Sequence, residues 1–521
     1  MGSGWGIRTM AVLAALAPPV SGGTSPEDGV VMGDNGQIHA CTGAQAGVAV
    51  LCVRADAAPG GSGTAVAPFA SIGAAIMAAK AGDIVQVAAG SYVENVAVGA
   101  FNSPVGKHLT LLGGFDAGFA ARDADVHASI IDGGLLGPTV QLHLNTSQTT
   151  TLDGFRITGG RGLGTDWQTG NGHGGGVYVE QLGSGTTVIS HNRIYGNRTN
   201  DHTSADSRGG GVHADTPTWD GFTGTVRIQD NWIHDNLGGK GAGINVVGRY
   251  AAIERNRIED NIGHNDHGGG VYVSTGSTDV RHNVIRGNVV GASAGYGWGG
   301  GIIVAAAGAD LVGNLITDNY TPSAGSGVFW DEGATGTMKN DLIVKNRCPQ
   351  GSRSGAAIYV DGGPGGPSTV AIENVTVADH VCPDTAPDGA AVVVEDGSAI
   401  TVRNSIFWGN TREFVTLSGG SYSIVYSITQ QAGTGNIHAN PLFADAANGD
   451  YHLRSAGGRY TPTGWVLDAV TSPGIDAGDP ASDFAQESQP NGGRINLGAW
   501  GNTAQASRSP GSDLIFANGF E

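Results

Sequence analysis

Short segments in which apolar and polar positions alternate recur through the middle of this chain. Pairs such as Val177 with Val179, and Ile302 with Val304, place two apolar side chains on one side of a backbone bounded by glycine and asparagine. A period of two over a few residues is typical of β-strands, whose successive side chains point to opposite faces. Helical repeats would need long apolar segments of 3.6-residue spacing. The repeated part of the chain has none.

Each alternating segment belongs to a longer repeat. The repeat opens with a glycine-rich run, GGGVYV at Gly174, and closes with a turn that carries asparagine at both ends, NRIYGN at Asn192. The opening returns at Gly209, Gly241, Gly268, Gly299, Gly325, Gly355 and Gly389. These openings are 26 to 35 residues apart, a period that predicts a solenoid. About 30 residues hold roughly three short strands and three bends, which predicts one coil of a parallel β-helix.

The asparagines of the closing turns predict two stacked rows. Asparagine tolerates the left-handed backbone of a tight bend, and stacked amides hydrogen-bond along the stack. We expect one row to comprise Asn192, Asn231, Asn256, Asn283, Asn314, Asn340, Asn374 and Asn404. The other would comprise Asn197, Asn236, Asn261, Asn288, Asn319, Asn346 and Asn410, with His380 as the counterpart in one coil. The alternative is that these asparagines are solvated turn residues.

The pattern changes at both ends of the chain. A set of apolar positions at helical spacing predicts a helix that covers the open end of the solenoid: Ala70, Ile72, Ala75, Ile76 and Ala79. Arg8, followed by an apolar run over residues 10–20, is typical of a secretory signal peptide, with a disordered start as the alternative. We therefore expect a signal peptide (1–23), a leader (24–62), an N-terminal cap with the first coils (63–160), regular coils (161–412), C-terminal coils with an irregular cap (413–505), and a linker with a tail (506–521).

Charge and hydropathy narrow the possible partners. The chain has 27 Lys and Arg residues against 46 Asp and Glu, a net charge of −19, which argues against a nucleic-acid partner because such binding depends on neutralising phosphates. After the N-terminal run, no segment is apolar enough to cross a bilayer. The chain has 90 glycines, but it is not of low complexity, because in the repeated part glycine recurs at fixed positions of the repeat.

Four cysteines favour export from the cell. Cys41 and Cys52 are close enough in sequence to close a small loop. Cys348 and Cys382 take the same position in consecutive coils, and a coil spacing of about 4.8 Å suits the Cα separation of a disulfide. We predict that both pairs are oxidised. No spacing of Cys and His indicates a metal site, and we predict neither a metal nor another cofactor.

Both ends of the solenoid resemble a known group. Residues 63–98, with LTLLGGFDAGFAARDADVHASIIDGG after them, resemble the start of secreted bacterial right-handed parallel β-helix repeat proteins of the pectin-lyase-like superfamily. NPLFADAANGDYHLRSAG at Asn440, SPGIDAGDP at Ser472 and GGRINLGAWGNTAQAS at Gly492 are similar to that group's C-terminal segment. The resemblance, over roughly residues 60–507, implies an all-β, right-handed parallel β-helix of three-strand coils with an N-terminal capping helix and an irregular C-terminal cap. It does not select an activity, because the superfamily includes lyases, hydrolases, esterases and adhesins.

The active-site motifs of that superfamily are missing. The chain has no adjacent pair of aspartates, which a polygalacturonase-like hydrolase requires, and Gly172-His173-Gly174 matches only a short element of that pattern. Motifs similar to those of pectinesterases and classical pectate lyases are also absent.

The residue before each glycine run provides the main candidate site. His173, Arg208, Lys240, His267 and Trp298 take this position in consecutive coils, and stacking would align them over about 20 Å. Arg208 and Lys240 could pair with the carboxylates or sulfates of an acidic polysaccharide, and Trp298 could offer its face to a sugar ring. We expect a second outward row of apolar surface from Tyr178, His213, Tyr272, Phe329 and Tyr359.

Lyase chemistry is possible at the same place. Abstraction of a proton beside a uronate carboxylate needs a base with a pKa near neutrality and a cation that neutralises the carboxylate. Lys240 would be the base and Arg208 its neighbour, because nearby cations lower the pKa of a lysine.

The sequence therefore predicts a secreted or surface-associated monomer that binds an extracellular polysaccharide through His173, Arg208, Lys240, His267 and Trp298. Three alternatives stay open. The first is a polysaccharide lyase, or another carbohydrate-active enzyme, in which Lys240 and Arg208 are catalytic. The second is a structural, adhesin-like surface protein. The third is a solvated stripe without a binding function.

Overall fold

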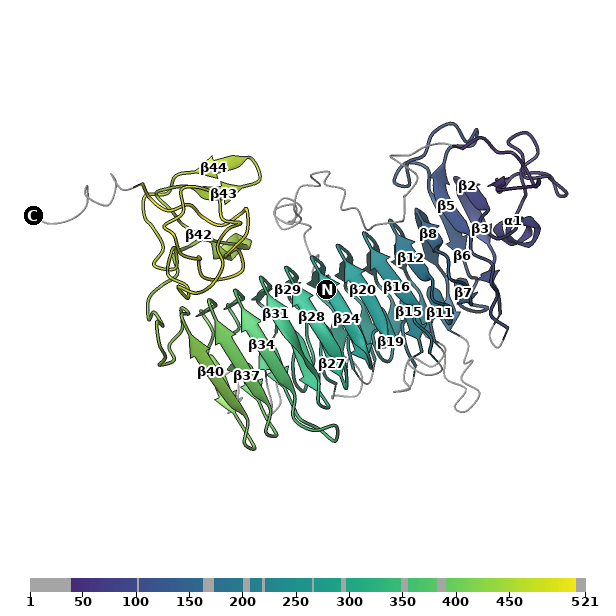
Figure 1. Cartoon of the computed structure of the whole chain (residues 1–521). Helices are drawn as coiled ribbons and strands as arrows, with labels where there is room; N and C mark the ends of the chain where they lie inside the picture. Colours follow the sequence, from purple (N-terminus) through teal and green to yellow (C-terminus); the bar gives the residue numbers. More distant parts are fainter. Residues whose placement is uncertain are drawn as a thin grey trace, which may run out of the picture.

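The computed structural model is an elongated solenoid of parallel β-strands (Figure 1). It describes residues 39–100, 103–162, 173–199, 207–217, 221–264, 267–291, 297–347, 355–381 and 390–511. The expected signal peptide (1–23), the tail beyond residue 511, and both Cys348 and Cys382 lie outside the described residues. Oxidation of the second cysteine pair therefore stays a prediction.

Three long parallel sheets form the sides of the solenoid within the described ranges. The first sheet contains β1 (Val50–Val53), β2 (Ile84–Ala88), β5 (Thr110–Phe115), β8 (Thr150–Asp153), β12 (Thr186–Ser190), β16 (Thr225–Gln229), β20 (Tyr250–Glu254), β24 (Ser277–Arg281), β28 (Gly308–Val312), β31 (Thr335–Lys339), β34 (Thr369–Glu373), β37 (Ala399–Arg403) and β40 (Ser421–Val425). The second contains β4 (Val96–Val98), β7 (Val140–Leu144), β11 (Val177–Gln181), β15 (Val212–Thr216), β19 (Ile244–Gly248), β23 (Val271–Ser274), β27 (Ile302–Ala305), β30 (Val328–Asp331), β33 (Gly355–Val360), β36 (Ala390–Val394) and β39 (Phe414–Thr416).

The third sheet and a narrow fourth one complete each coil. The third contains β3 (Gly90–Val93), β6 (Ser129–Asp132), β9 (Phe155–Thr158), β13 (Arg193–Tyr195), β17 (Trp232–His234), β21 (Arg257–Glu259), β25 (Val284–Arg286), β29 (Leu315–Thr317), β32 (Leu342–Val344), β35 (Thr376–Ala378) and β38 (Ile406–Trp408). The fourth contains β10 (Arg161–Gly162), β14 (Arg198–Thr199), β18 (Leu237–Gly238), β22 (Ile262–Gly263) and β26 (Val289–Val290).

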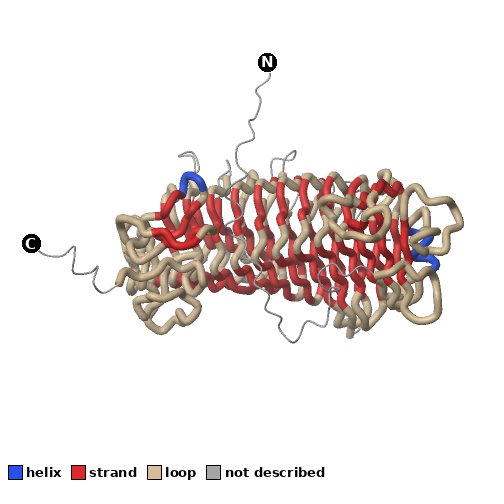
Figure 2. Tube along the Cα trace, turned by 90° about the horizontal axis from the view of Figure 1, so that it is seen from above, coloured by secondary structure: helices blue, strands red, loops and turns tan. Residues whose placement is uncertain are grey.

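The chain passes through the three long sheets once in every coil. In one coil β11, β12 and β13 follow one another, and β15 then begins the next coil beside β11. The pairing is in register, with Val177 opposite Val212 and Val212 opposite Ile244. Seen from above, the strands lie side by side along the solenoid, and each runs across its long axis (Figure 2). The predicted all-β fold of three-strand coils is confirmed.

Inward apolar side chains from all three sheets fill the core. Val177, Ile189 and Ile194, one from each sheet of the same coil, are fully buried, and so are their counterparts in the following coils. Burial of apolar surface stabilises by about 25 cal/mol per Å². Because each coil stacks directly on the next, this core is continuous along the solenoid.

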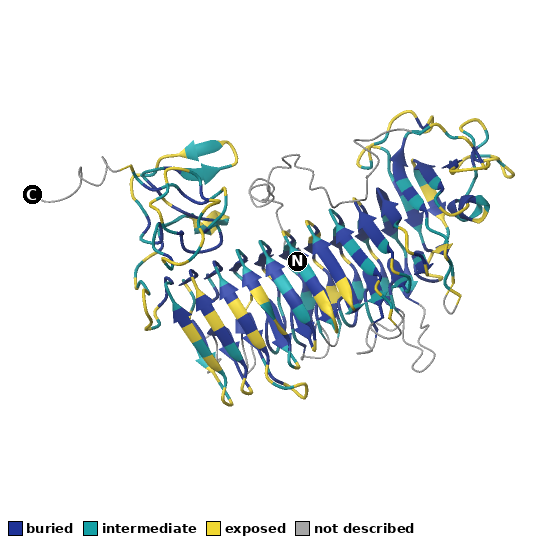
Figure 3. Ribbon diagram, in the orientation of Figure 1, coloured by how far each residue is buried: buried dark blue, intermediate teal, exposed yellow. Residues whose placement is uncertain are grey.

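The outer faces of the sheets differ in exposure. Along β34 and β37 of the first sheet, outward positions are largely exposed and inward ones buried (Figure 3). Strands β27, β33 and β36 of the second sheet are buried on both faces. At these three strands other side chains thus cover the outer face of the second sheet, and the predicted site lies along the same sheet.

The first asparagine row is confirmed from Asn192 to Asn314. Each side-chain Nδ2 donates to the Oδ1 of the asparagine one coil further, at 3.1 Å between Asn192 and Asn231 and 3.0 Å between Asn283 and Asn314. The same Oδ1 also accepts the backbone N–H of the preceding asparagine. Beyond Asn314 the acceptor is the Oδ1 of Asp341, at 2.9 Å.

The prediction was wrong for Asn340, Asn374 and Asn404. These residues precede the ladder position by one, and their φ angles of 55°, 52° and 53° place them in the left-handed region. Their side chains bond to the C-terminal cap: Asn340 Nδ2 donates to the carbonyl oxygen of Gly501 at 2.8 Å, and Asn374 Nδ2 donates to that of Asn496 at 2.9 Å. A one-residue shift within a bend turns the side chain out of the coil, because successive residues of the bend point in different directions.

The second asparagine row is confirmed, including its one substitution. The amides connect Asn197, Asn236, Asn261, Asn288, Asn319 and Asn346 coil by coil. The ring of His380 then lies between Asn346 and Asn410, at 3.3 Å from Asn346 Nδ2 and 3.0 Å from Asn410 Oδ1.

The predicted helix is α1 (Ile72–Ala78) at the N-terminal end. The Ser71 side chain accepts the N–H of Ala74 and caps it, and the helix buries Ile72, Ala75 and Ile76. It packs against β1, β2 and β4, so the expected cover of the first coil is confirmed. Strand β1 lies inside the expected leader (24–62) and pairs with β2, so the solenoid begins before residue 62.

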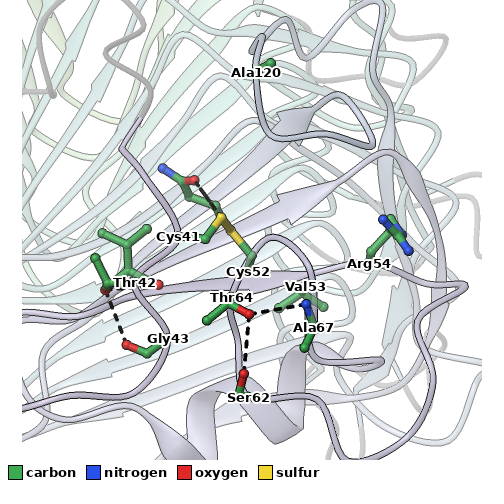
Figure 4. Close-up of a disulfide and its surroundings, with 12 residues drawn as sticks. Cys41, Thr42, Gly43, Cys52, Val53, Arg54, Ser62, Thr64, Ala67 and Ala120 are labelled. Carbon is green, nitrogen blue, oxygen red and sulfur yellow. Dashed lines mark hydrogen bonds between the residues drawn. A yellow bond between two sulfur atoms is a disulfide. The ribbon is translucent and has the colours of Figure 1, made fainter.

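The predicted disulfide between Cys41 and Cys52 is confirmed, with Cα atoms 5.7 Å apart (Figure 4). Cys52 belongs to β1 and is fully buried beside Ala88 and Phe115. The bond thus ties the segment before the first strand to the first sheet.

The C-terminal cap consists of two antiparallel hairpins and a short 3-10 helix. Strand β41 (Phe443–Asp445) pairs with β42 (Asp450–Leu453), β43 (Arg459–Thr461) pairs with β44 (Gly464–Val466), and η3 covers Ala446–Asn448. The cap lies beside the C-terminal half of the solenoid (Figure 1). Tyr451 of the cap packs against Leu342 and Val344 of the third sheet. In the described part of the chain, no helix has the length and hydropathy to span a membrane.

Candidate functional site

His173, Arg208, Lys240, His267 and Trp298, here called the basic row, stand before successive strands of the second sheet. Backbone bridges pair His173 with Arg208, Arg208 with Lys240, and His267 with Trp298. The backbone N–H of Gly241, which follows Lys240, donates to the carbonyl oxygen of His267 at 3.0 Å. This bond connects the coil of Lys240 to the coil of His267. The structure thus brings all five predicted site residues into one row across five consecutive coils.

The glycines after the basic row make this alignment possible. Gly174 has a φ of 59°, in the left-handed region that glycine adopts without a steric cost. A Cβ on Gly176 would stand 2.6 Å from the carbonyl oxygen of Gly211 in the next coil. Larger residues would therefore force neighbouring coils apart at the start of the second sheet.

The side chains of the basic row are half-buried and lie over the second sheet. The ring of His173 stacks on His213 with centroids 5.0 Å apart, and His267 stacks on Trp298 at 4.9 Å. The Nζ of Lys240 lies 5.6 Å from the ring centroid of Tyr272. These contacts hold the basic row against the aromatic side chains beneath it.

The predicted outward aromatic row has the expected register but is not a surface. Tyr178 lies opposite His213, and Phe329 lies opposite Tyr359. All members are nearly inaccessible: Tyr178 5%, His213 2%, Tyr272 8%, Phe329 2% and Tyr359 1% exposed. The expectation of an apolar surface was therefore wrong, because the side chains around the row, those of the basic row among them, pack over these rings. Burial, with the charges of His173 and Arg208, holds the pKa of His213 well below its usual value.

In the described part of the chain, two buried side-chain nitrogens of this face are donors for which no hydrogen-bond partner is found. They are the Nε of Arg208 and the Nδ2 of Asn245. Asn245 uses its Oδ1 to accept from the Nδ1 of His213 at 2.9 Å. Unsatisfied buried donors are rare in folded proteins, and a ligand is one way to satisfy them.

Two groups of carboxylates, not expected from the sequence, share a third register position on this face, and three coils with Val247, Ser274 and Ala305 separate them. Glu180 is the fourth residue of β11 and lies opposite Asp215 in the next coil. Asp331, Asp361 and Glu395 follow at the same position in later coils. The sequence repeat contains the information that locates these carboxylates. Each carboxylate is the sixth residue after the first glycine of its opening, as in GGGVYVE and GGGVHAD.

Burial and mutual repulsion change the acidity of these carboxylates. Burial raises the pKa of Asp215 to about 6, with a contribution from Glu180, while Arg208 opposes the shift. Burial raises the pKa of Asp331 to about 6 as well, and Asp361 adds to the effect. Glu180 accepts a hydrogen bond from the Nδ1 of His143 at 2.9 Å. The face therefore pairs cations with carboxyl groups that can hold or release a proton near neutral pH.

No set of three His, Cys, Asp or Glu side chains gathers as metal ligands would within the described ranges.

One family model and several solved structures are similar to this chain. Residues 242–429 match the family model described as "Right handed beta helix region". Similar solved structures include pectate lyase Pel9A, with 13% identity, a TM-score of 0.39 and coverage of 88% of this chain and 99% of that one. Another is the A-module of the mannuronan C-5 epimerase AlgE4 of Azotobacter vinelandii, with 14% identity, a TM-score of 0.32 and coverage of 71% and 94%. A third is XylC in complex with xylose, with 11% identity, a TM-score of 0.31 and coverage of 71% and 86%.

No curated protein matches the chain. At the identities and TM-scores found, the similar structures carry no conclusion about activity. The stacked three-strand coils, together with the matched region, show that this chain contains a right-handed parallel β-helix.

Proposed function

We propose that this protein is secreted or surface-associated and binds an acidic polysaccharide along the outer face of its second sheet. The observation that carries the proposal is the backbone bridging that holds His173, Arg208 and Lys240, and then His267 and Trp298, in one row. Cations repeated at a coil spacing of about 4.8 Å suit a polymer with repeated anionic groups. Charge-assisted hydrogen bonds to such groups are roughly twice as strong as neutral ones.

Two further features support binding at this face. The buried Nε of Arg208 has no hydrogen-bond partner among the residues that the structure describes, so a ligand oxygen that reached it would remove an energetic penalty. The row is also cationic on a chain of net charge −19, where cations are in the minority.

The disulfide between Cys41 and Cys52 supports an extracellular location, because such bonds persist in oxidising compartments.

Affinity electrophoresis of the full chain in gels that contain uronate or sulfated polysaccharides tests the proposal. We expect Arg208→Gln and Lys240→Gln each to weaken binding by about tenfold, since a hydrogen bond to a charged group contributes about 1.5–3 kcal/mol. Arg403→Gln is a matched control, because Arg403 lies on the first sheet and pairs with Glu373 at 3.1 Å. Equal binding by the wild type and both variants would refute the proposed face.

One observation favours catalysis on a polysaccharide as a second candidate function. Asp215, whose pKa is about 6, lies in register with Glu180 and is influenced by Arg208. A carboxyl group of this acidity can act as a general acid or base near neutral pH, while a guanidinium neutralises a substrate carboxylate. Lys240, the base expected from the sequence, stands one coil from Arg208 in the same row.

Incubation with uronate polymers separates binding from catalysis. Ultraviolet absorbance from unsaturated chain ends, lost in Asp215→Asn or Lys240→Ala, would establish a lyase. Binding without product supports the primary proposal. A structural, adhesin-like role without glycan recognition predicts neither binding nor product across the whole panel.

A further inference from the structure

The outer face of the third sheet carries a row of side chains that changes character along the solenoid. In its N-terminal half the row consists of Arg156, Arg193, Trp232 and Arg257, which lie opposite one another in successive coils. It continues with Val284, Leu315 and Leu342. The apolar members pack with Tyr451 of the C-terminal cap. The first three members instead line a pocket.

This pocket has a volume of about 440 Å³. Its walls include Arg156, Arg193 and Trp232 from the row, His191 from the bend before β13, and Arg122 with Asp125 from the segment between β5 and β6. Pockets of about 300 Å³ and above accommodate small organic ligands. The site is on a different face from the basic row.

Two of the four carboxylates that line the pocket, those of Asp153 and Asp230, are already neutralised, and the other two belong to Asp123 and Asp125. Asp153 is almost fully buried, pairs with Arg122, and accepts hydrogen bonds from Ser190 Oγ and His191 Nδ1, each at 2.7 Å. Asp230 forms a bidentate pair with Arg255, with both N–O distances at 2.8 Å. Neither carboxylate is therefore available to balance Arg156 or Arg193.

The guanidinium groups of Arg156 and Arg193 are held in place without an acidic partner among the described residues. Arg193 lies over the Trp232 ring, 4.2 Å from its centroid, and its Nε donates to the Nε2 of His234 at 2.9 Å. Arg156 donates one hydrogen bond to the carbonyl oxygen of Asp125 at 3.0 Å. Both therefore present fixed positive charge to the pocket, which reduces the entropy lost on binding an anion.

His191 adds a third cationic donor. Its side chain is half exposed, and Asp153 holds its Nδ1, which leaves Nε2 toward the open side of the ring. The hydrogen bond to Asp153, reinforced by the charges of Asp153 and Asp230, raises the pKa of His191, while burial and Arg122 oppose the shift. The imidazolium form is thus favoured where the ring meets the pocket.

We propose that this pocket binds a single acidic sugar, whose carboxylate or sulfate pairs with Arg156, Arg193 and His191 and whose hydroxyl groups reach the carboxylate of Asp125. The mixture of guanidinium donors and an acidic acceptor matches a ligand that carries both an anionic group and hydroxyls. The site is separate from the polymer-binding face proposed above and does not depend on it.

Saturation-transfer NMR and calorimetry with glucuronate, at low ionic strength, test the site in the full chain. We expect glucuronate to bind and glucose, which lacks the anion, not to bind. Arg156→Gln and Arg193→Gln should each lower the affinity for glucuronate by about tenfold, since each removes a charge-assisted hydrogen bond. Arg257→Gln is the matched control. It belongs to the same row and also lies against Trp232, but it pairs with Glu259 at 2.9 Å and does not line the pocket.

Three outcomes would overturn the inference. They are the absence of glucuronate binding, equal binding of glucuronate and acetate, and a loss in Arg257→Gln equal to that in Arg156→Gln. Thermal melting of each variant identifies any that fails to fold, and having two independent arginine variants preserves the test if one does. Arg208→Gln and Lys240→Gln should leave glucuronate binding at the pocket unchanged, so failure here is distinguishable from failure of the proposed polymer-binding face.

Discussion

Asn314 donates two hydrogen bonds to one carboxylate oxygen of Asp341, from its backbone N at 2.8 Å and from its Nδ2 at 2.9 Å. Asp341 takes the place of an asparagine at the end of the first ladder, and it is fully buried. Burial raises its pKa to about 7, although the bonds from Asn314 oppose the shift. One position of the ladder therefore carries an ionisable group inside the coil.

Asp341→Asn should stabilise the protein above neutral pH. The folded state holds the proton of Asp341 more tightly than the unfolded chain, so this residue lowers stability progressively as pH rises from about 4 to about 7. An asparagine would keep the acceptor for Asn314 and could donate to the carbonyl oxygen of Leu311, by analogy with Asn314 and Val280. We expect a gain of about 1–3 kcal/mol at pH 8 and a smaller one at pH 5. Chemical denaturation at both pH values measures it, and no gain at pH 8 would contradict the prediction.

His380 in the second row should have the opposite pH dependence. Burial lowers its pKa to about 4, so the folded state excludes a proton that the unfolded chain binds below about 6.5. Its destabilising effect is therefore absent above pH 6.5 and grows as pH falls toward 4. His380→Asn should leave stability at pH 7.5 within about 1 kcal/mol and raise it at pH 5 by about 1–2 kcal/mol. Melting curves at the two pH values check this, and equal shifts at both would count against it.

Removal of the disulfide should destabilise the N-terminal end. Cys41 and Cys52 are 11 residues apart, and closing a loop of that length contributes roughly 2–3 kcal/mol. The double variant Cys41→Ala with Cys52→Ala should therefore melt earlier and become sensitive to protease around β1. Non-reducing peptide mapping of the wild type verifies this bond and also tests the predicted pair of Cys348 and Cys382. Unchanged melting of the double variant would show that the bond is not stabilising.

Asn374 should hold the C-terminal cap on the solenoid. Its Nδ2 donates to the carbonyl oxygen of Asn496 at 2.9 Å, and its φ of 52° suits only asparagine, aspartate or glycine well. Asn374→Gly keeps this backbone and removes only the amide, whereas Asn374→Ala adds about 1 kcal/mol of backbone strain. Both should accelerate proteolysis within residues 479–501. A cap equally resistant in both variants would show that other contacts suffice.

Asp215→Asn should strengthen the binding of an acidic polymer at pH 7.5. With a pKa of about 6, Asp215 is mostly ionised at that pH and opposes an anionic ligand beside Arg208. We expect a gain of about threefold, in line with the modest energy of a single partly exposed charge. Asp310→Asn on the first sheet serves as a control. A loss of binding in Asp215→Asn would instead indicate that Asp215 hydrogen-bonds to the ligand.

The repeat made much of this structure predictable. Alternation around Val177 and Val179 defines which side chains point inward, and the glycine run after His173 defines where each coil starts. Both are local properties of the chain, and a solenoid repeats them at each coil. For that reason the three-strand coils, the capping helix and the alignment of Arg208 with Lys240 followed from spacing alone.

The direction, exposure and acidity of several side chains depend on contacts between stacked coils, which the sequence pattern does not show. Asn314 and Asn340 occupy similar turns, yet a shift of one residue directs Asn314 into the ladder and Asn340 toward the cap. The aromatic row around Tyr272 lies beneath other side chains, and the acidity of Asp215 depends on burial beside Glu180. Arg193 meets Trp232 only because the two belong to adjacent coils, 39 residues apart in the chain. Sequence by itself determined the coil and its period, whereas exposure, acidity and the pocket were decided by tertiary structure, because they depend on which side chains of neighbouring coils and caps come into contact.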